Sequence, residues 1–168
     1  MEEPKRIPSS IKLIDRVGNP LDWNTVDKCL LIICFWMLIA PLTSLLIHHF
    51  ISYPAKVPFL DPVVMKKVMP LGWGFGVAWS ILLVVGLQLR HRRSENRTFA
   101  YVTVLLWWGQ EAFAAVCLGP LTTPAAMVLL GQGVLALLLF EMPVVLLGLG
   151  FALLLVVGSI IASQYGLF

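Results

Sequence analysis

Glu111 is the residue whose type and position point most directly to chemistry. From Thr98 to Phe168 the chain contains no lysine or arginine, and Glu111 and Glu141 are its only charged side chains. Glu111 follows Gln110 inside an apolar run, where we expect a carboxyl group to be protonated or hydrogen-bonded because burial penalises the charged form. Three roles are open: a polar clasp between two helices, part of a ligand or proton site, or a contact with lipid or another subunit.

Gln132 is the polar residue that best matches Glu111. Counting 1.5 Å per residue from the ends of the predicted spans puts the two at about the same depth in a ~30 Å core. The glycines on either side of Gln132 permit close approach of a helix or a ligand. Trp107 and Trp108 point in different directions, so we expect at least one to face lipid or a binding cavity. The predicted ligand-binding residues are therefore Gln110, Glu111, Gln132, Trp107 and Trp108.

The histidines and cysteines favour no metal or cofactor. His48 and His49 lie at one end of the first span and His91 lies at the opposite membrane face, whereas a bis-histidine haem site normally takes ligands at matching depth. We interpret the histidines as interfacial residues, and the three cysteines, which have no paired spacing, as apolar filling. The chain has no HExxH motif, nucleophile elbow, Walker motif or paired carboxylates at helical spacing, so we predict no enzymatic activity.

The composition predicts a membrane protein. Hydrophobic residues make up 59% of the 168 residues and charged residues 12%, and the mean hydropathy is +0.89. We predict an all-α, polytopic transmembrane bundle over residues 28–168, in which Pro41 kinks the first helix. The five predicted spans are Lys28 to Phe50, Val68 to Leu89, Phe99 to Leu118, Pro124 to Phe140 and Val144 to Ser163.

The distribution of basic residues predicts the orientation. All lysines and arginines lie in the first 97 positions, so the net charge of +3 indicates topology rather than nucleic-acid binding. We expect the segment 1–27 and the loop from Arg90 to Arg97 to be cytoplasmic. The segment 1–27 is predicted to carry a short interfacial helix, with a solvated tail as the alternative. Glycosylation at the Asn96 sequon would invert this orientation, but we interpret the sequon as a chance match. Glu141 falls on the same face in a solvated turn, where a salt bridge to Arg90 or Arg93 is available.

Small residues recur at four-residue intervals in two of the spans. Such faces let helices approach closely, either inside one bundle or between two copies, and the sequence leaves both open. The last two spans are joined by only three residues and should form a tight antiparallel hairpin. The small residues are Gly72, Gly76 and Ser80 in the second span, and the pairs Gly148/Ala152 and Gly158/Ala162 in the fifth.

One segment carries a family resemblance. Leu118 to Phe140, LGPLTTPAAMVLLGQGVLALLLF, together with the basic loop before the third span, resembles the N-terminal multi-span sensor or anchor domains of bacterial diguanylate cyclases, class III nucleotide cyclases and related signalling proteins. The resemblance implies a dimeric membrane module that holds or modulates a cytoplasmic output domain. No sixth span, coiled linker or output domain follows Phe168, which leaves two interpretations: the membrane part of a longer protein, or a likeness between two apolar hairpins.

These observations favour a sensory or anchoring module in a bacterial inner membrane, which binds a small or lipidic ligand within the bundle. Its partners would be the lipid bilayer and a second copy or a partner membrane subunit. Two alternatives stay open. The chain could be an accessory structural subunit of a larger membrane complex, or a small transporter or channel, which would need an aqueous path and preferably a basic partner for Glu111.

Overall fold

Five long helices and one short 3-10 helix make up the described part of the chain. The computed structural model describes residues 19–52, 62–91, 96–118 and 123–165. The predicted interfacial helix before residue 18 lies outside these residues, as does most of the Gly119 to Pro124 turn. The elements are η1 (Pro20–Asp22), α2 (Thr25–Ser52), α3 (Pro62–His91), α4 (Arg97–Leu118), α5 (Thr123–Leu139) and α6 (Met142–Gln164).

Each predicted span coincides with one observed helix, and asparagine side chains explain where two of the helices begin. Asn24 precedes α2 and its Oδ1 accepts a hydrogen bond from the backbone N–H of Asp27 at 2.7 Å. Asn96 precedes α4 and accepts from the backbone N–H of Phe99 at 3.2 Å. These are N-caps, which satisfy backbone donors that the first helical turn leaves without a partner. The prediction of an all-helical bundle is therefore confirmed, although α2 and α3 extend several residues beyond the predicted spans.

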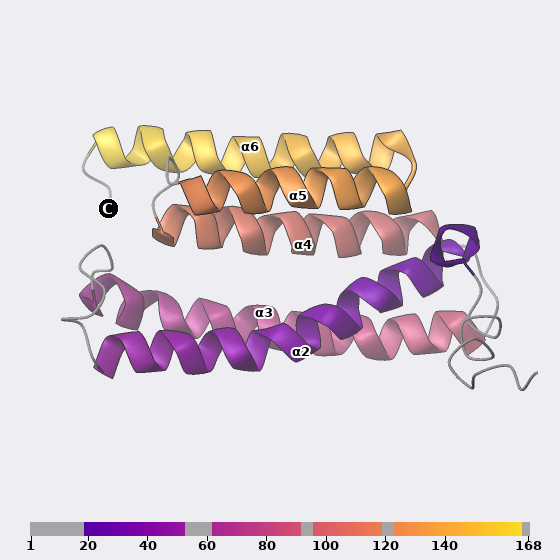
Figure 1. Ribbon diagram of the computed structural model, residues 1–168, viewed down its shortest axis with the longest axis horizontal. Helices are drawn as coiled ribbons and strands as arrows, with labels where there is room; N and C mark the ends of the chain where they lie inside the picture. Colours follow the sequence, from indigo (N-terminus) through magenta and orange to yellow (C-terminus); the bar gives the residue numbers. More distant parts are fainter. Residues whose placement is uncertain (1–18, 53–61, 92–95, 119–122, 166–168) are drawn as a thin grey trace, which may run out of the picture.

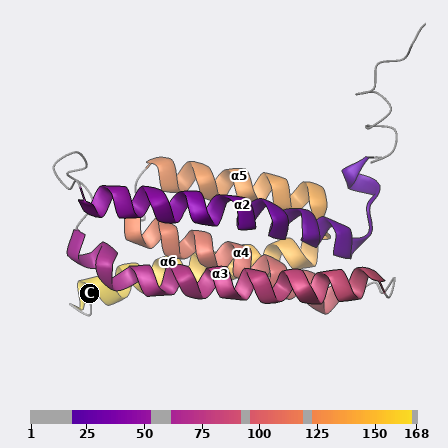
Figure 2. The same cartoon turned by 90° about the horizontal axis from the view of Figure 1, so that it is seen from below.

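All five helices run along the long axis of the molecule, with α4 at the centre (Figures 1 and 2). Helix α4 packs against each of the other four, most extensively against α6, and α2 pairs with α3. Figure 1 also shows that α2 changes direction along its length, as expected for a helix with Pro41 inside. Only Phe140 and Glu141 separate α5 from α6, and the two helices are antiparallel as predicted, although α6 packs more extensively on α4 than on α5.

Three of the helices are long and apolar enough to cross a membrane. The qualifying segments are Thr25–Leu42, Met69–His91 and Met142–Ala162, and Met127–Leu139 of α5 is a shorter apolar stretch. Helix α4 is not among them although it is the most enclosed helix. A central helix covered by its neighbours contacts less lipid, so it tolerates polar residues that a lipid-facing helix would not.

Both described ion pairs lie at the end of the bundle where α2 and α4 begin and α3 and α5 end (Figure 1). Arg90 Nε lies 2.8 Å from Asp27 Oδ1, and Arg97 Nη2 lies 3.6 Å from Glu141 Oε1. The predicted pairing of Glu141 with Arg90 is therefore wrong, and Arg93 lies outside the described residues. The helix register explains the difference, because Arg97 opens α4 beside the α5–α6 turn while the end of α3 lies against the first turn of α2.

Candidate functional site

The predicted site residues on α4 divide between two faces of that helix. Gln110 faces α3, where its Oε1 accepts a hydrogen bond of 2.5 Å from Trp79 Nε1. Trp79 is fully buried and stacks on Trp36 of α2, with ring centroids 6.4 Å apart and planes 11° from parallel. Gln110 is thus engaged in joining α4 to the α2–α3 pair. Nothing in the sequence pattern marks Trp79 as the partner of Gln110, since a tryptophan in the middle of a span is also ordinary apolar bulk.

Trp108 lies on the other side of α4, against α6. Its indole ring is fully buried beside Gly148, whose hydrogen occupies a place where a Cβ atom would lie 2.6 Å from Trp108 Cδ1 and 2.7 Å from Val104 Cγ1. Only glycine fits at this contact, because real Cβ atoms do not approach other heavy atoms so closely. The two helices therefore pack backbone against ring. Among the described residues the Trp108 Nε1–H group has no hydrogen-bond acceptor.

Gln132 is a second buried polar group without a partner. Its side chain is 7% exposed, and neither its amide oxygen nor its amide nitrogen has a hydrogen-bond partner among the residues that the structure describes. The next residue, Gly133, is where α5 meets the ring of Trp108, since a Cβ there would lie 3.7 Å from Cη2. The α4–α5–α6 core therefore holds two unsatisfied polar groups, the Trp108 indole and the Gln132 amide, on adjoining helices.

Glu111 is buried as well, but at a different height. Its side chain is 9% exposed, and no described residue forms a hydrogen bond or salt bridge with its carboxyl group. At 1.5 Å per residue, Glu111 lies about 21 Å from the start of α4 while Gln132 lies about 10 Å from the end of α5, at the same end of the bundle. By the same count the backbone of Trp108 lies about 16 Å from that end, so Gln132 lies nearer in height to Trp108, whose ring reaches Gly133, than to Glu111. The sequence estimate placed them together because it assumed that α5 reaches as far across the membrane as α4 does.

Trp107 completes the predicted set. It is buried, like its neighbour Trp108, so neither adjacent tryptophan is exposed on the outer surface of the chain. The predicted residues thus make a buried polar core rather than an open pocket. Glu111, Gln132 and the two tryptophans do not line the α2–α3 groove, the cavity beside Phe151 or the recess beside Glu141, all of which the described residues form.

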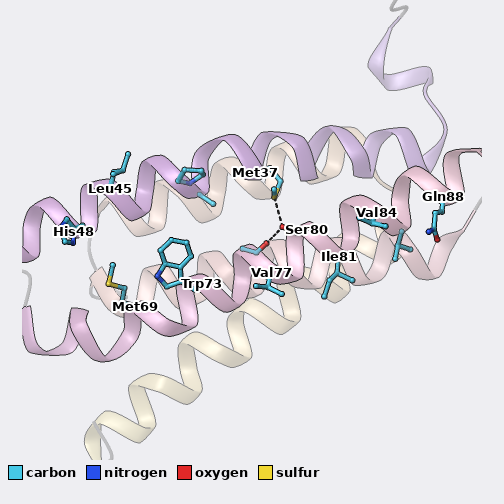
Figure 3. A pocket seen from close by; sticks show the side chains of 15 residues that line it. Met37, Leu45, His48, Met69, Trp73, Val77, Ser80, Ile81, Val84 and Gln88 are labelled. Carbon is cyan, nitrogen blue, oxygen red and sulfur yellow. Dashed lines mark hydrogen bonds between the residues drawn. The ribbon is translucent and has the colours of Figure 1, made fainter.

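The largest described cavity is a groove between α2 and α3 of about 1080 Å³ (Figure 3). The predicted small-residue face lines it: a Cβ at Gly72 or Gly76 would meet no atom within 4 Å, and Ser80 is exposed. Ser80 Oγ donates to the carbonyl oxygen of Gly76 at 2.9 Å and lies 3.8 Å from Met37 Sδ. Trp73 projects along the same side of α3 and is 64% exposed. The face is therefore open within this chain.

The remaining candidates are arranged as follows. His48 lines one end of the α2–α3 groove, and Gln88 lines the other (Figure 3). Within the described ranges no three His, Cys, Asp or Glu side chains gather closely enough to hold a metal ion.

Comparison with known protein families, with curated proteins and with solved structures finds no match for this chain.

Proposed function

We propose that this chain is an integral membrane module of five spans, with a cytoplasmic N-terminus, that binds a small or lipidic ligand through a polar group in the α4–α5–α6 core. In this proposal it serves as the sensory or anchoring part of a bacterial signalling protein. The observation that carries the proposal is the buried Gln132 amide, which lacks a partner for its donor and its acceptor.

The Gln132 amide lies in an apolar helix, where a polar group without hydrogen-bond partners is unfavourable. Leaving a buried donor or acceptor unmet costs about 1 to 3 kcal/mol, and water is scarce at membrane depth. Such a group is explained when a bound molecule supplies the missing partners. Gln132 offers one acceptor and two donor hydrogens, and the Trp108 indole has a further unmet donor in the same three-helix core. A ligand with adjacent acceptor and donor atoms, such as a carboxylic acid, an amide or an alcohol, fits this pair.

Replacing Gln132 with leucine separates a ligand site from a structural clasp. For the ligand-free protein we expect Gln132→Leu to raise the free energy of unfolding by about 1 to 3 kcal/mol, because the unmet polar group is removed. The same change should abolish retention of any small molecule that wild-type protein carries through purification, detected by mass spectrometry of the extracted protein. A clasp predicts the opposite, a loss of stability.

Gln88→Leu is the matched control, because Gln88 is an exposed glutamine on α3, away from this core. It should leave both stability and retention unchanged. The proposal fails if wild-type protein extracted in a mild detergent carries no molecule that the Gln132→Leu variant lacks.

The predicted orientation has its own test. Residues 24 and 52 flank α2 at opposite ends, so single cysteines at Asn24 and Ser52 in a background without the native cysteines should label from opposite sides. We expect Asn24→Cys to react with a membrane-impermeant maleimide only after the cells are opened, and Ser52→Cys to react in intact cells. Labelling of Asn24→Cys in intact cells would contradict the orientation.

The open α2–α3 groove favours a second candidate, an accessory subunit that seats one transmembrane helix of a partner. The groove extends from Met69 to Gln88, about 28 Å along α3, which matches the ~30 Å of a hydrocarbon core. Its floor at Gly72 and Gly76 has room for a helix backbone. Gly76→Ile should then release the partner from a complex isolated in mild detergent while the chain itself stays folded. Retention of the partner would exclude this face.

A further inference from the structure

A small recess lies at the end of the bundle that carries the two ion pairs, apart from the buried polar core. It has a volume of about 260 Å³ and is formed where the first turns of α2 and α4 meet the α5–α6 connection. Its polar lining comes from Thr25, Lys28, Arg97 and Glu141, and its apolar lining from residues such as Ala100 and Leu139. The recess therefore combines a charged rim with an apolar floor.

The described residues neutralise the cations at this rim only in part. Lys28 forms no salt bridge with any described residue. The Arg97 side chain is 79% exposed and that of Glu141 67%, and the 3.6 Å between them is too long for a strong hydrogen bond and leaves most of the Arg97 donors unused. Two cations and one carboxylate leave the recess with a net positive charge.

The nearby Arg90, in contrast, forms a close ion pair. Its Nε lies 2.8 Å from Asp27, and neither residue lines the recess. The carboxylate that neighbours Lys28 in sequence is therefore committed to α3 and does not neutralise the recess. Lys28 and Arg97 are the positive groups that remain available there.

The position of the recess indicates which class of anion it binds. The recess lies where the apolar segment Thr25–Leu42 of α2 begins, and in a bilayer the end of such a segment lies at the level of the lipid headgroups. Basic pockets between transmembrane helices at this level recognise anionic headgroups. We propose that the recess binds the phosphate of an anionic phospholipid, with Lys28 and Arg97 as its ligands and the acyl chains lying against the apolar lining. This inference depends on membrane insertion but not on a ligand at Gln132.

The test measures how strongly the delipidated protein retains phosphatidylglycerol. Purified protein in a neutral detergent is titrated with phosphatidylglycerol in a background of phosphatidylcholine, and bound lipids are counted by native mass spectrometry. Lys28→Gln and Arg97→Gln should each weaken retention about fivefold, the factor expected from removal of one membrane-surface cation. Lys28→Arg should restore it. Lys66→Gln is the matched control, because Lys66 is an exposed lysine near the start of α3, at the opposite end of the bundle.

Glu141→Gln is the more decisive variant, because it should strengthen lipid retention whereas Lys28→Gln and Arg97→Gln should weaken it. Removing the carboxylate frees Arg97 and removes a repulsive charge, so retention should rise severalfold. A purely structural role for the Arg97–Glu141 pair predicts that both variants lose affinity together. Inorganic phosphate added as a competitor should displace the lipid poorly, because it lacks acyl chains.

Three results would overturn the inference: equal retention by Lys28→Gln and wild-type protein, weaker retention by Glu141→Gln, or an equal loss in Lys66→Gln. Displacement by inorganic phosphate as effective as displacement by free phosphatidylglycerol would overturn the assignment to a lipid. Gln132→Leu should leave phosphatidylglycerol retention unchanged, so failure of this site and failure of the proposed core ligand site are seen separately.

Discussion

Two small-residue faces of this chain have similar sequences and opposite surroundings. On α6, Gly148 and Ala152 are buried, and a Cβ at Gly148 would lie under 3.0 Å from the ring of Trp108. On α3, Gly72 and Gly76 have the same four-residue spacing, yet a Cβ at either would meet nothing within 4 Å. A small-residue face therefore shows that close approach is allowed, while the facing helix decides whether it happens.

The helices that face these two surfaces, α4 opposite α6 and α2 opposite α3, carry different residues at the contact. Helix α4 supplies the flat ring of Trp108, which fills the space that Gly148 leaves empty. Helix α2 carries Pro41, which lines the groove opposite the α3 glycines, and a proline inside a helix disturbs its direction. The α4–α6 contact is thus closed within one chain, and the α2–α3 contact is open along one side.

The largest effect is expected when the closed contact is overfilled. Gly148→Ala places a methyl group against Trp108 and Val104, and we expect a loss of about 1 to 3 kcal/mol in the free energy of unfolding. The measurement is unfolding of detergent-solubilised protein by a denaturing detergent, followed by tryptophan fluorescence. Trp108→Leu in the same chain should recover part of the loss, because it makes room for the methyl group.

Gly150→Ala on the same helix provides the control. A Cβ at Gly150 has no neighbour within 4 Å, so this variant should lose no stability and should gain about 0.5 kcal/mol from the lower backbone entropy of alanine. If Gly148→Ala is as stable as Gly150→Ala, the α4–α6 contact is looser than described and the contrast between the two faces disappears.

A smaller effect is expected at the link between the two regions. Trp79 of α3 donates to Gln110 of α4, so this hydrogen bond joins the open pair to the closed core. A double-mutant cycle of Trp79→Phe and Gln110→Leu should give a coupling energy of about 0.5 to 1.7 kcal/mol, the size found for hydrogen bonds between membrane helices. A coupling energy near zero would mean that the two regions are held together by packing alone.

The sequence predicted the helices well because one physical rule governs them: long apolar runs cross a bilayer, and prolines, glycines and charges separate them. It also selected Glu111 and Gln132, since polar residues inside apolar runs are conspicuous. The sequence did not predict the depth of each side chain or its hydrogen-bond partner. The depth of Gln132 depends on the short length of α5, and the hydrogen bond between Trp79 and Gln110 depends on how α3 and α4 are rotated against each other. Neither quantity is encoded in the spacing along a single helix.

The smallest effect is expected at the open face. Gly76→Ala adds a methyl group where no atom lies within 4 Å, and alanine loses less backbone entropy than glycine when a helix forms, so the variant should gain about 0.5 kcal/mol. Ser80 Oγ keeps its bond to the residue 76 carbonyl, because that bond involves only the backbone of residue 76. The measurement is the same unfolding experiment, at a detergent concentration that keeps the protein monomeric. A loss of 1 kcal/mol or more, comparable to that of Gly148→Ala, would mean that α2 closes on α3 in the folded monomer, and the two faces would then be alike.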